Sequence, residues 1–294
     1  MMRIMLFLAT NIAVMVLISI VLKLVGFQGF MTAHGTALDL QQLLVYSAVI
    51  GFVGSFASLM MSKMMAKWSM GVEVIDQPKS EFEGWLLRTV ERLAGQAGVK
   101  MPEVGIFDSE APNAFATGWN KDAALVAVST GLLNGMTRDE IEAVLGHELS
   151  HVANGDMVTL TLIQGVVNTF VIFLSRIIGF FVDQMLFRGN SDDRDRGPGI
   201  GFFISSLVAQ IVLGVFATMI VAWFSRWREF RADAGGAHLA GRQKMIDALR
   251  RLQQGQEAPM PNELVAFGIN TGHMSLFASH PPLEDRIKAL ENQA

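Results

Sequence analysis

The sequence contains no cysteine among its 294 residues, and this absence limits the chemistry that the chain can perform. Disulfide bonds, zinc sites built from thiolates and cysteine nucleophiles are all excluded. Any metal ion that the chain binds must therefore be held by histidine, aspartate or glutamate side chains.

Charged residues are also scarce, at 17% of the chain, whereas 51% of the residues are hydrophobic. A soluble globular domain typically has about 25% charged residues. The composition therefore indicates a membrane protein, with the lipid bilayer as a partner. Because 23 Lys and Arg face 27 Asp and Glu, the net charge is −4. This balance argues against a basic surface that follows a nucleic acid backbone, so we expect no nucleic acid partner.

Four apolar stretches are long enough to form transmembrane helices, because a helix needs about 20 residues to cross about 30 Å of hydrocarbon. They are residues 4–25, 43–61, 158–178 and 199–224. A secretory signal peptide is the alternative for the first stretch. Its apolar run is longer than a signal peptide needs, however, and no small-residue cleavage site follows it.

The distribution of positive charge predicts the orientation of these helices. Arg3 precedes the first stretch, and Lys63 and Lys67 follow the second, while the connection between the two stretches has neither Lys nor Arg. The positive-inside rule then places residues 68–157 in the cytoplasm. The third and fourth stretches either cross out and back or form a hairpin that only dips into the bilayer. In both cases residues 225–294 return to the same side.

A small α+β domain is expected between the second and third apolar stretches. Hydrophobic periodicity predicts a helix over residues 82–97 and strands over residues 103–107, 114–117 and 125–129. Residues 137–140 form a capping box that starts a further helix. The expected fold class is thus mostly α, a multi-pass membrane protein with four transmembrane helices and a cytoplasmic α+β domain.

The capped helix carries the motif His147-Glu148-Leu149-Ser150-His151. Histidines four residues apart project from one face of a helix, one turn apart, and can bind the same metal ion. Glu148 lies about 100° further around the helix than His147, which suits a general base beside the metal. The alternative is a pair of surface histidines on an amphipathic helix.

Catalytic zinc needs three protein ligands and an open fourth position. No histidine follows His151 closely, so the third ligand is expected elsewhere. Glu229 comes directly after the fourth apolar stretch, with Asp233 on the same helical face. Glu229 can ligate zinc while Asp233 orients a ligand histidine. The alternative is an ordinary charged turn next to the membrane, in which neighbouring arginines pair with both acids.

Three segments together resemble the HtpX family of bacterial membrane zinc proteases, which is related to the type 1 CAAX prenyl proteases: residues 147–156 (HELSHVANGD), 229–233 (EFRAD) and 279–282 (SHPP). The resemblance covers essentially the whole chain. It implies a zincin-like protease domain with one Zn²⁺ per chain, His147, His151 and Glu229 as zinc ligands and Glu148 as the catalytic base. It also implies a place in the bacterial inner membrane, an active site facing the cytoplasm and a role in quality control of misfolded membrane proteins.

His280 and Arg286 are the candidates for stabilising the oxyanion that forms during peptide hydrolysis. The related prenyl proteases are similar in carrying a His and an Arg at this spacing. Two alternatives remain open: residues 279–282 form only a turn that stops a helix, or Arg286 pairs with a nearby or distant acid.

Residues Asn113, Ala114, Phe115 and Ala116 resemble the family's substrate-binding strand. Extended peptides commonly bind by adding a strand to an exposed sheet edge. The expected substrates are proteins or peptides, membrane proteins above all. The alternative is an interior strand that only packs the domain.

These observations predict a membrane-anchored, zinc-dependent metalloendopeptidase. In an intramembrane protease the histidine motif lies inside an apolar span, whereas here charged residues precede it. In a catalytically silent zinc-stabilised scaffold or chaperone-like binder a fourth protein ligand usually closes the site, and Glu148 has no role. A transporter needs polar groups within its spans, and these stretches have few.

Overall fold

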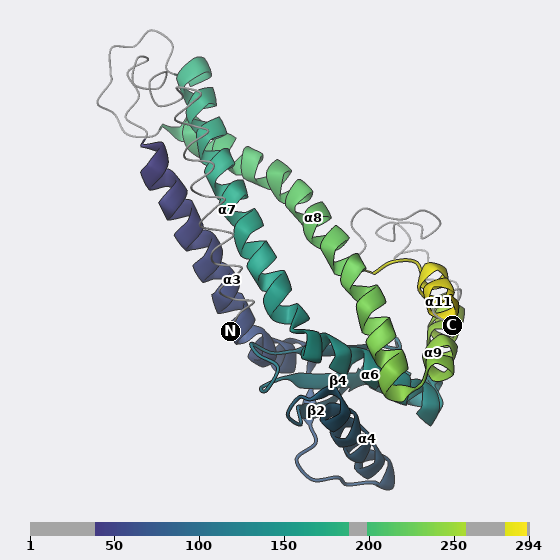
Figure 1. The fold of residues 1–294 in the computed structure, drawn as a ribbon. Helices are drawn as coiled ribbons and strands as arrows, with labels where there is room; N and C mark the ends of the chain where they lie inside the picture. Colours follow the sequence, from purple (N-terminus) through teal and green to yellow (C-terminus); the bar gives the residue numbers. More distant parts are fainter. Residues whose placement is uncertain (1–38, 188–198, 257–279, 293–294) are drawn as a thin grey trace. The chain divides into compact units, whose positions relative to one another are not determined.

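The computed structural model describes residues 39–187, 199–256 and 280–292 (Figure 1). The chain forms two compact units. We call the first the helical unit, Met1–Phe56 with Thr161–Ile220, and the second the mixed unit, Ala57–Leu160 with Val221–Ala294. The expected apolar helix at residues 4–25 lies outside the described residues.

Three helices among the described residues are long and apolar enough to cross a membrane: α3 (Leu40–Met70), α7 (Asp156–Val182, continued by the π-helix Asp183–Phe187) and α8 (Ile200–Ala240). They contain the predicted stretches 43–61 and 158–178 and, from Ile200 onward, the stretch 199–224. Both α3 and α8 continue beyond their apolar stretches without a break (Figure 1). Glu229 therefore lies on the same helix as the fourth apolar stretch, in the polar end of α8.

Small residues bring α3 and α7 close together in the helical unit. A Cβ atom on Gly51 would lie 2.7 Å from Thr169 Oγ1 and 2.9 Å from the Gly165 carbonyl oxygen. One turn away, Asn168 Nδ2 donates a 3.4 Å hydrogen bond to Ser55 Oγ. Close backbone approach and hydrogen bonds between helices are the interactions that stabilise helix pairs in lipid.

The mixed unit contains a four-stranded sheet in the order β1-β2-β4-β3. Its strands are β1 (Glu73–Val74), β2 (Glu103–Phe107), β3 (Ala114–Thr117) and β4 (Leu125–Ser129). Strands β2 and β4 are parallel, and the other pairs are antiparallel. The strands predicted at residues 103–107, 114–117 and 125–129 are confirmed. The sequence analysis missed β1, whose two residues are too few for an alternating pattern.

The predicted helices of the mixed unit are also confirmed. Helix α4 (Glu81–Ala97) begins where the Ser80 side chain accepts a hydrogen bond from Glu83 N, and it ends at Gly98 with φ 68°. The short helix α5 (Thr130–Gly135) follows β4. Helix α6 (Arg138–Asn154) begins with the predicted capping box of Thr137 and Glu140. Helix α6 packs against α4, α9 and β3, and so lies at the centre of this unit.

The segment from residue 234 to 252 contains the end of α8 and most of a second helix. Helix α8 ends at Ala240, and α9 (Arg242–Gln256) begins after Gly241. Gly241 has φ 109°, a conformation that residues with a side chain rarely adopt. The chain can therefore bend here, and α9 packs against both α6 and α11 (Leu283–Glu291).

Candidate metal centre

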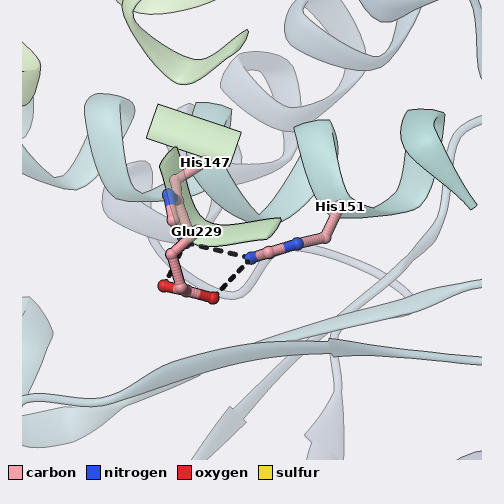
Figure 2. A group of neighbouring side chains, drawn as sticks. All are labelled: His147, His151 and Glu229. Atoms are coloured by element: carbon pink, nitrogen blue, oxygen red, sulfur yellow. Dashed lines mark hydrogen bonds and ion pairs between the residues drawn. The ribbon is translucent and has the colours of Figure 1, made fainter. Parts of the chain in front are cut away.

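Two helices of the mixed unit bring three metal-binding side chains together. Helix α6 supplies His147 and His151, and the polar end of α8 supplies Glu229 (Figure 2). The two Nε2 atoms are 3.1 Å apart. Glu229 Oε2 lies 3.6 Å from His147 Nε2, and Glu229 Oε1 lies 3.3 Å from His151 Nε2. The structure thus brings together all three ligands expected from the sequence.

This spacing fits a tetrahedral zinc ion. Zinc lies about 2.0–2.2 Å from nitrogen and oxygen ligands, so two ligand atoms of a tetrahedral site are about 3.4 Å apart. The three separations observed, 3.1, 3.3 and 3.6 Å, lie around that value. Two nitrogens and one carboxylate also form a donor set that is typical of catalytic zinc.

The outer nitrogen of each histidine faces a buried carboxylate. His147 Nδ1 lies 2.9 Å from Asp233 Oδ1, and His151 Nδ1 lies 2.7 Å from Asp156 Oδ2. A carboxylate at Nδ1 favours the tautomer in which Nδ1 carries the proton and the Nε2 lone pair is free for a metal. Asp233 lies where the sequence analysis expects an orienting residue.

Asp156 was not identified as a site residue from the sequence, although it is the last residue of the 147–156 motif. Helix α6 ends at Gly155 in the left-handed conformation, with φ 66°. This turn brings Asp156, the first residue of α7, back toward His151. A buried ion pair with Arg228 of α8 holds the other oxygen of Asp156. Arg228 also donates a 3.4 Å hydrogen bond to the Asn154 carbonyl oxygen.

Glycines allow the polar end of α8 to approach α6 closely. A Cβ atom on Gly236 would lie 2.9 Å from His147 N, and one on Gly235 would lie 2.5 Å from Ser150 Oγ. On the facing helix, a Cβ atom on Gly146 would lie 3.3 Å from the Gly236 carbonyl oxygen. The close contact occurs beside His147, so it sets the distance between α6 and the polar end of α8.

Arg286 of α11 is buried, with 6% of its surface exposed, and pairs with two acids of α8. Its Nε and Nη2 donate to Asp233 at 2.7 and 2.6 Å, and its Nη1 lies 3.2 Å from Glu229 Oε2. The observed pairing matches the alternative in which Arg286 binds a distant acid. An additional interaction with an oxyanion stays a prediction.

His280 also reaches the centre: its Nδ1 lies 2.7 Å from Glu229 Oε2. Unlike the other histidines of the cluster, its side chain is 63% exposed. It therefore borders the site from the solvent side. Its expected role as an oxyanion donor stays a prediction.

The environment of Glu148 suits a base. Its side chain is half-buried on α6. Burial raises the pKa of the Glu148 carboxyl above its usual range, and the neighbouring His147 and His151 only partly offset this effect. Carboxylates whose pKa is raised toward neutrality make effective proton acceptors and donors in catalysis.

His147 and His151 both have pKa values above the ordinary value of a histidine. Burial lowers the pKa of His147, but hydrogen bonds to Asp233 and Glu229 outweigh it. Burial likewise lowers the pKa of His151, and its hydrogen bond to Glu229 together with the charges of Glu148 and Glu229 outweighs that effect. Protons therefore compete with a metal ion for these nitrogens.

Strand β3 contains three of the four predicted substrate-strand residues and lies at the edge of the described sheet, paired only with β4. Asn113 directly precedes it and is held by Ser129, whose Oγ accepts a 2.9 Å hydrogen bond from Asn113 N. The strand also packs against α6. The free edge of β3 can therefore pair with an extended peptide. The role of this strand in substrate binding stays a prediction.

The sequence matches Peptidase family M48 over residues 80–294. Protease HtpX from Pseudoalteromonas atlantica is 64% identical over 99% of both chains, and Protease HtpX from Pseudomonas savastanoi pv. phaseolicola is 58% identical over the full length of both. A crystal structure of S. mikatae Ste24p has a similar fold, with a TM-score of 0.64 and 22% identity. That match covers 84% of this chain and 58% of the Ste24p chain.

The fold, the histidine cluster and these relatives together define a membrane metalloprotease. The chain belongs to Peptidase family M48. The resemblance noted from the three sequence motifs is thereby confirmed.

Proposed function

We propose that the chain is a zinc-dependent endopeptidase that hydrolyses peptide bonds at the cytoplasmic face of the bacterial inner membrane. The observation that carries this proposal is the convergence of His147 Nε2, His151 Nε2 and the Glu229 carboxylate at separations of 3.1–3.6 Å. The carboxylates at both Nδ1 atoms support it, because they leave the Nε2 lone pairs directed at one point.

The three ligands would hold one zinc ion, which when bound polarises a substrate carbonyl and lowers the pKa of water. In the mechanism we propose, Glu148 accepts a proton from the attacking water at its carboxylate. It then donates that proton to the nitrogen of the leaving amine. Burial raises the pKa of the Glu148 carboxyl, which makes its carboxylate a stronger base for the water proton than an ordinary glutamate.

Charge on the substrate oxygen needs a donor from the chain. We assign this role to His280, because its side chain is mostly exposed and its Nδ1 lies 2.7 Å from Glu229 Oε2. Arg286 forms ion pairs with Asp233 and Glu229 and so holds both side chains in place. In the proposed mechanism its positive charge also lowers the energy of the oxyanion.

The proposed substrate lies extended along the free edge of β3, which packs against the helix that carries both histidines. Backbone hydrogen bonds then provide affinity without a strict sequence requirement. Such tolerance suits the removal of misfolded membrane proteins. Glu229 follows the apolar part of α8 by only five residues, so cleavage would occur close to the membrane surface.

The test is a casein proteolysis assay on detergent-purified protein that is prepared in chelator and then titrated with zinc. We expect hydrolysis to appear with zinc in the wild type and to be absent in Glu148→Gln at every zinc concentration. Zinc-independent cleavage would contradict the proposal. Tight zinc binding without hydrolysis of casein or of an unfolded membrane protein would favour the scaffold instead.

A further inference from the structure

The tryptophans of the described residues are unusually exposed. Four of the five tryptophans in the chain, Trp68, Trp119, Trp223 and Trp227, have more than half of their surface accessible. Three of these four lie on α3 or α8, near the point where the apolar part of each helix ends. Tryptophan is enriched at such membrane–water boundaries. The fourth, Trp119, lies instead in the connection between β3 and β4 and is 54% exposed.

The connection that carries Trp119 has a defined conformation. Gly118 has φ 146°, and a Cβ atom on it would lie 2.8 Å from the Ala123 carbonyl oxygen. Asp122 N donates a 2.7 Å hydrogen bond to Asn120 Oδ1, and Ala123 N donates a 3.3 Å bond to the Asn120 carbonyl. These contacts therefore hold the backbone of the turn that carries the Trp119 side chain.

The turn between β3 and β4 is connected to the end of the apolar part of α3. Next to the turn, the Ala124 carbonyl oxygen accepts a 3.0 Å hydrogen bond from Glu103 N. The Glu103 carboxylate binds Lys63 Nζ at 2.7 Å and Lys67 Nζ at 2.5 Å. Lys63 is the first charged residue after the apolar stretch 43–61. One hydrogen bond and two ion pairs thus link the Trp119 turn to the residues of α3 that directly follow its apolar stretch.

Two further exposed apolar side chains lie close in sequence to Glu103 and Lys63. Met101 precedes Glu103 by two residues, and Met64 directly follows Lys63 on α3; both are exposed. Near the turn tip, Lys121 is exposed as well. Apolar and aromatic side chains with a neighbouring lysine suit the lipid headgroup region, where an indole ring contacts apolar chains while its N–H remains hydrated.

We propose that the turn between β3 and β4, which carries Trp119, inserts into the headgroup region of the bilayer on the side where α3 leaves it. The ion pairs of Lys63 and Lys67 with Glu103 connect this turn to the polar end of α3. The insertion fixes one end of β3 at the membrane surface.

The absence of cysteine makes the test direct, because Trp119→Cys creates a single thiol for an environment-sensitive fluorophore. The full chain is labelled and placed in phosphatidylcholine–phosphatidylglycerol nanodiscs, in which both membrane faces are open to solvent. Quenching by shallow doxyl-labelled lipid is compared with quenching by iodide. Gln77→Cys, an exposed position before α4, is the control, and Lys121→Cys serves if Trp119→Cys does not fold.

We expect a blue-shifted emission at position 119, strong quenching by the doxyl lipid and several-fold weaker iodide quenching than at position 77. Iodide quenching equal to that at position 77, with no effect of the doxyl lipid, would overturn the proposal. Protection that appears only at high protein-to-lipid ratio would also overturn it, because a second copy of the chain would then cover the turn. Protection of position 119 from iodide that appears only when casein is added would also overturn the proposal, because the turn would then contact a peptide and not the bilayer.

Discussion

His151 Nδ1 lies 2.7 Å from Asp156 Oδ2, across the turn that separates α6 from α7. Asp156 is also paired with Arg228 on α8, seventy-two positions later in the chain. One carboxylate therefore connects His151 of α6 to the helix that supplies Glu229. Its geometry controls both the tautomer of His151 and the position of α8.

Replacing Asp156 with Asn should weaken zinc binding while leaving the three ligands in place. Losing the carboxylate at a ligand histidine typically lowers metal affinity about 10–100-fold. The dissociation constant is measured by competition with a coloured chelator. Asp122→Asn, at an exposed turn position, should bind zinc like the wild type. Equal affinity of the two variants would show that Asp156 does not orient His151.

Substitutions of Glu148 and Glu229 should affect catalysis and metal binding differently. Glu148→Gln should retain one zinc ion per chain and lose hydrolysis, because its amide cannot accept the water proton. Glu229→Ala should lose most of the zinc, since only two ligands remain. Zinc content after gel filtration and casein hydrolysis are both measured. Equal zinc loss in the two variants would overturn these assignments.

Local patterns in the sequence predict much of this fold. The strands at residues 103–107, 114–117 and 125–129 and the capping box at Thr137 match the structure because nearby residues determine them. The same holds for His147 and His151, whose four-residue spacing alone puts them on one face of a helix.

Interactions between distant segments were not predictable in the same way. Asp156 and Arg228 look like ordinary charged residues until the fold brings the first residue of α7 to the polar end of α8. The pairing of Arg286 with Asp233 joins residues 53 positions apart. The role of Gly236 depends on how close α6 lies. No sequence period encodes these contacts, so they require the tertiary structure.

Arg286→Met should destabilise the protein strongly, because it leaves Asp233 and Glu229 without their buried cation. Removing one partner of a buried ion pair costs about 3–5 kcal/mol. Arg250→Met removes a half-exposed pair with Glu291 and should cost about 0–1 kcal/mol. Thermal unfolding in detergent compares the two. Similar melting temperatures would contradict a structural role of Arg286.

Zinc should stabilise the protein more at high pH than at low pH. The pKa values of His147 and His151 are raised above their ordinary value of 6.5 in the metal-free protein. Their protonated forms therefore contribute stability below pH 6.5, and this contribution is lost as the pH rises through the raised values. Zinc binding instead needs the neutral imidazoles and releases protons.

The measurement for this prediction is the increase in melting temperature caused by saturating zinc, followed from about pH 6 to about pH 8. We expect the increase to grow with pH in the wild type. In Glu229→Ala the increase should be small throughout. An increase that is independent of pH in the wild type would show that the two histidines do not exchange protons for the metal.

Gly236→Ala should push α8 away from α6 and so weaken zinc binding. The added Cβ would lie 2.9 Å from His147 N, which belongs to the backbone and cannot rotate away. Gly95→Ala in α4 is the matched control, because no atom lies within 4 Å of its added Cβ. By helix propensity alone, alanine should stabilise that position by about 1 kcal/mol. Melting temperature and zinc affinity are measured for both variants. If Gly236→Ala binds zinc as tightly as Gly95→Ala, the glycine contact does not set the distance between the ligand-bearing helices.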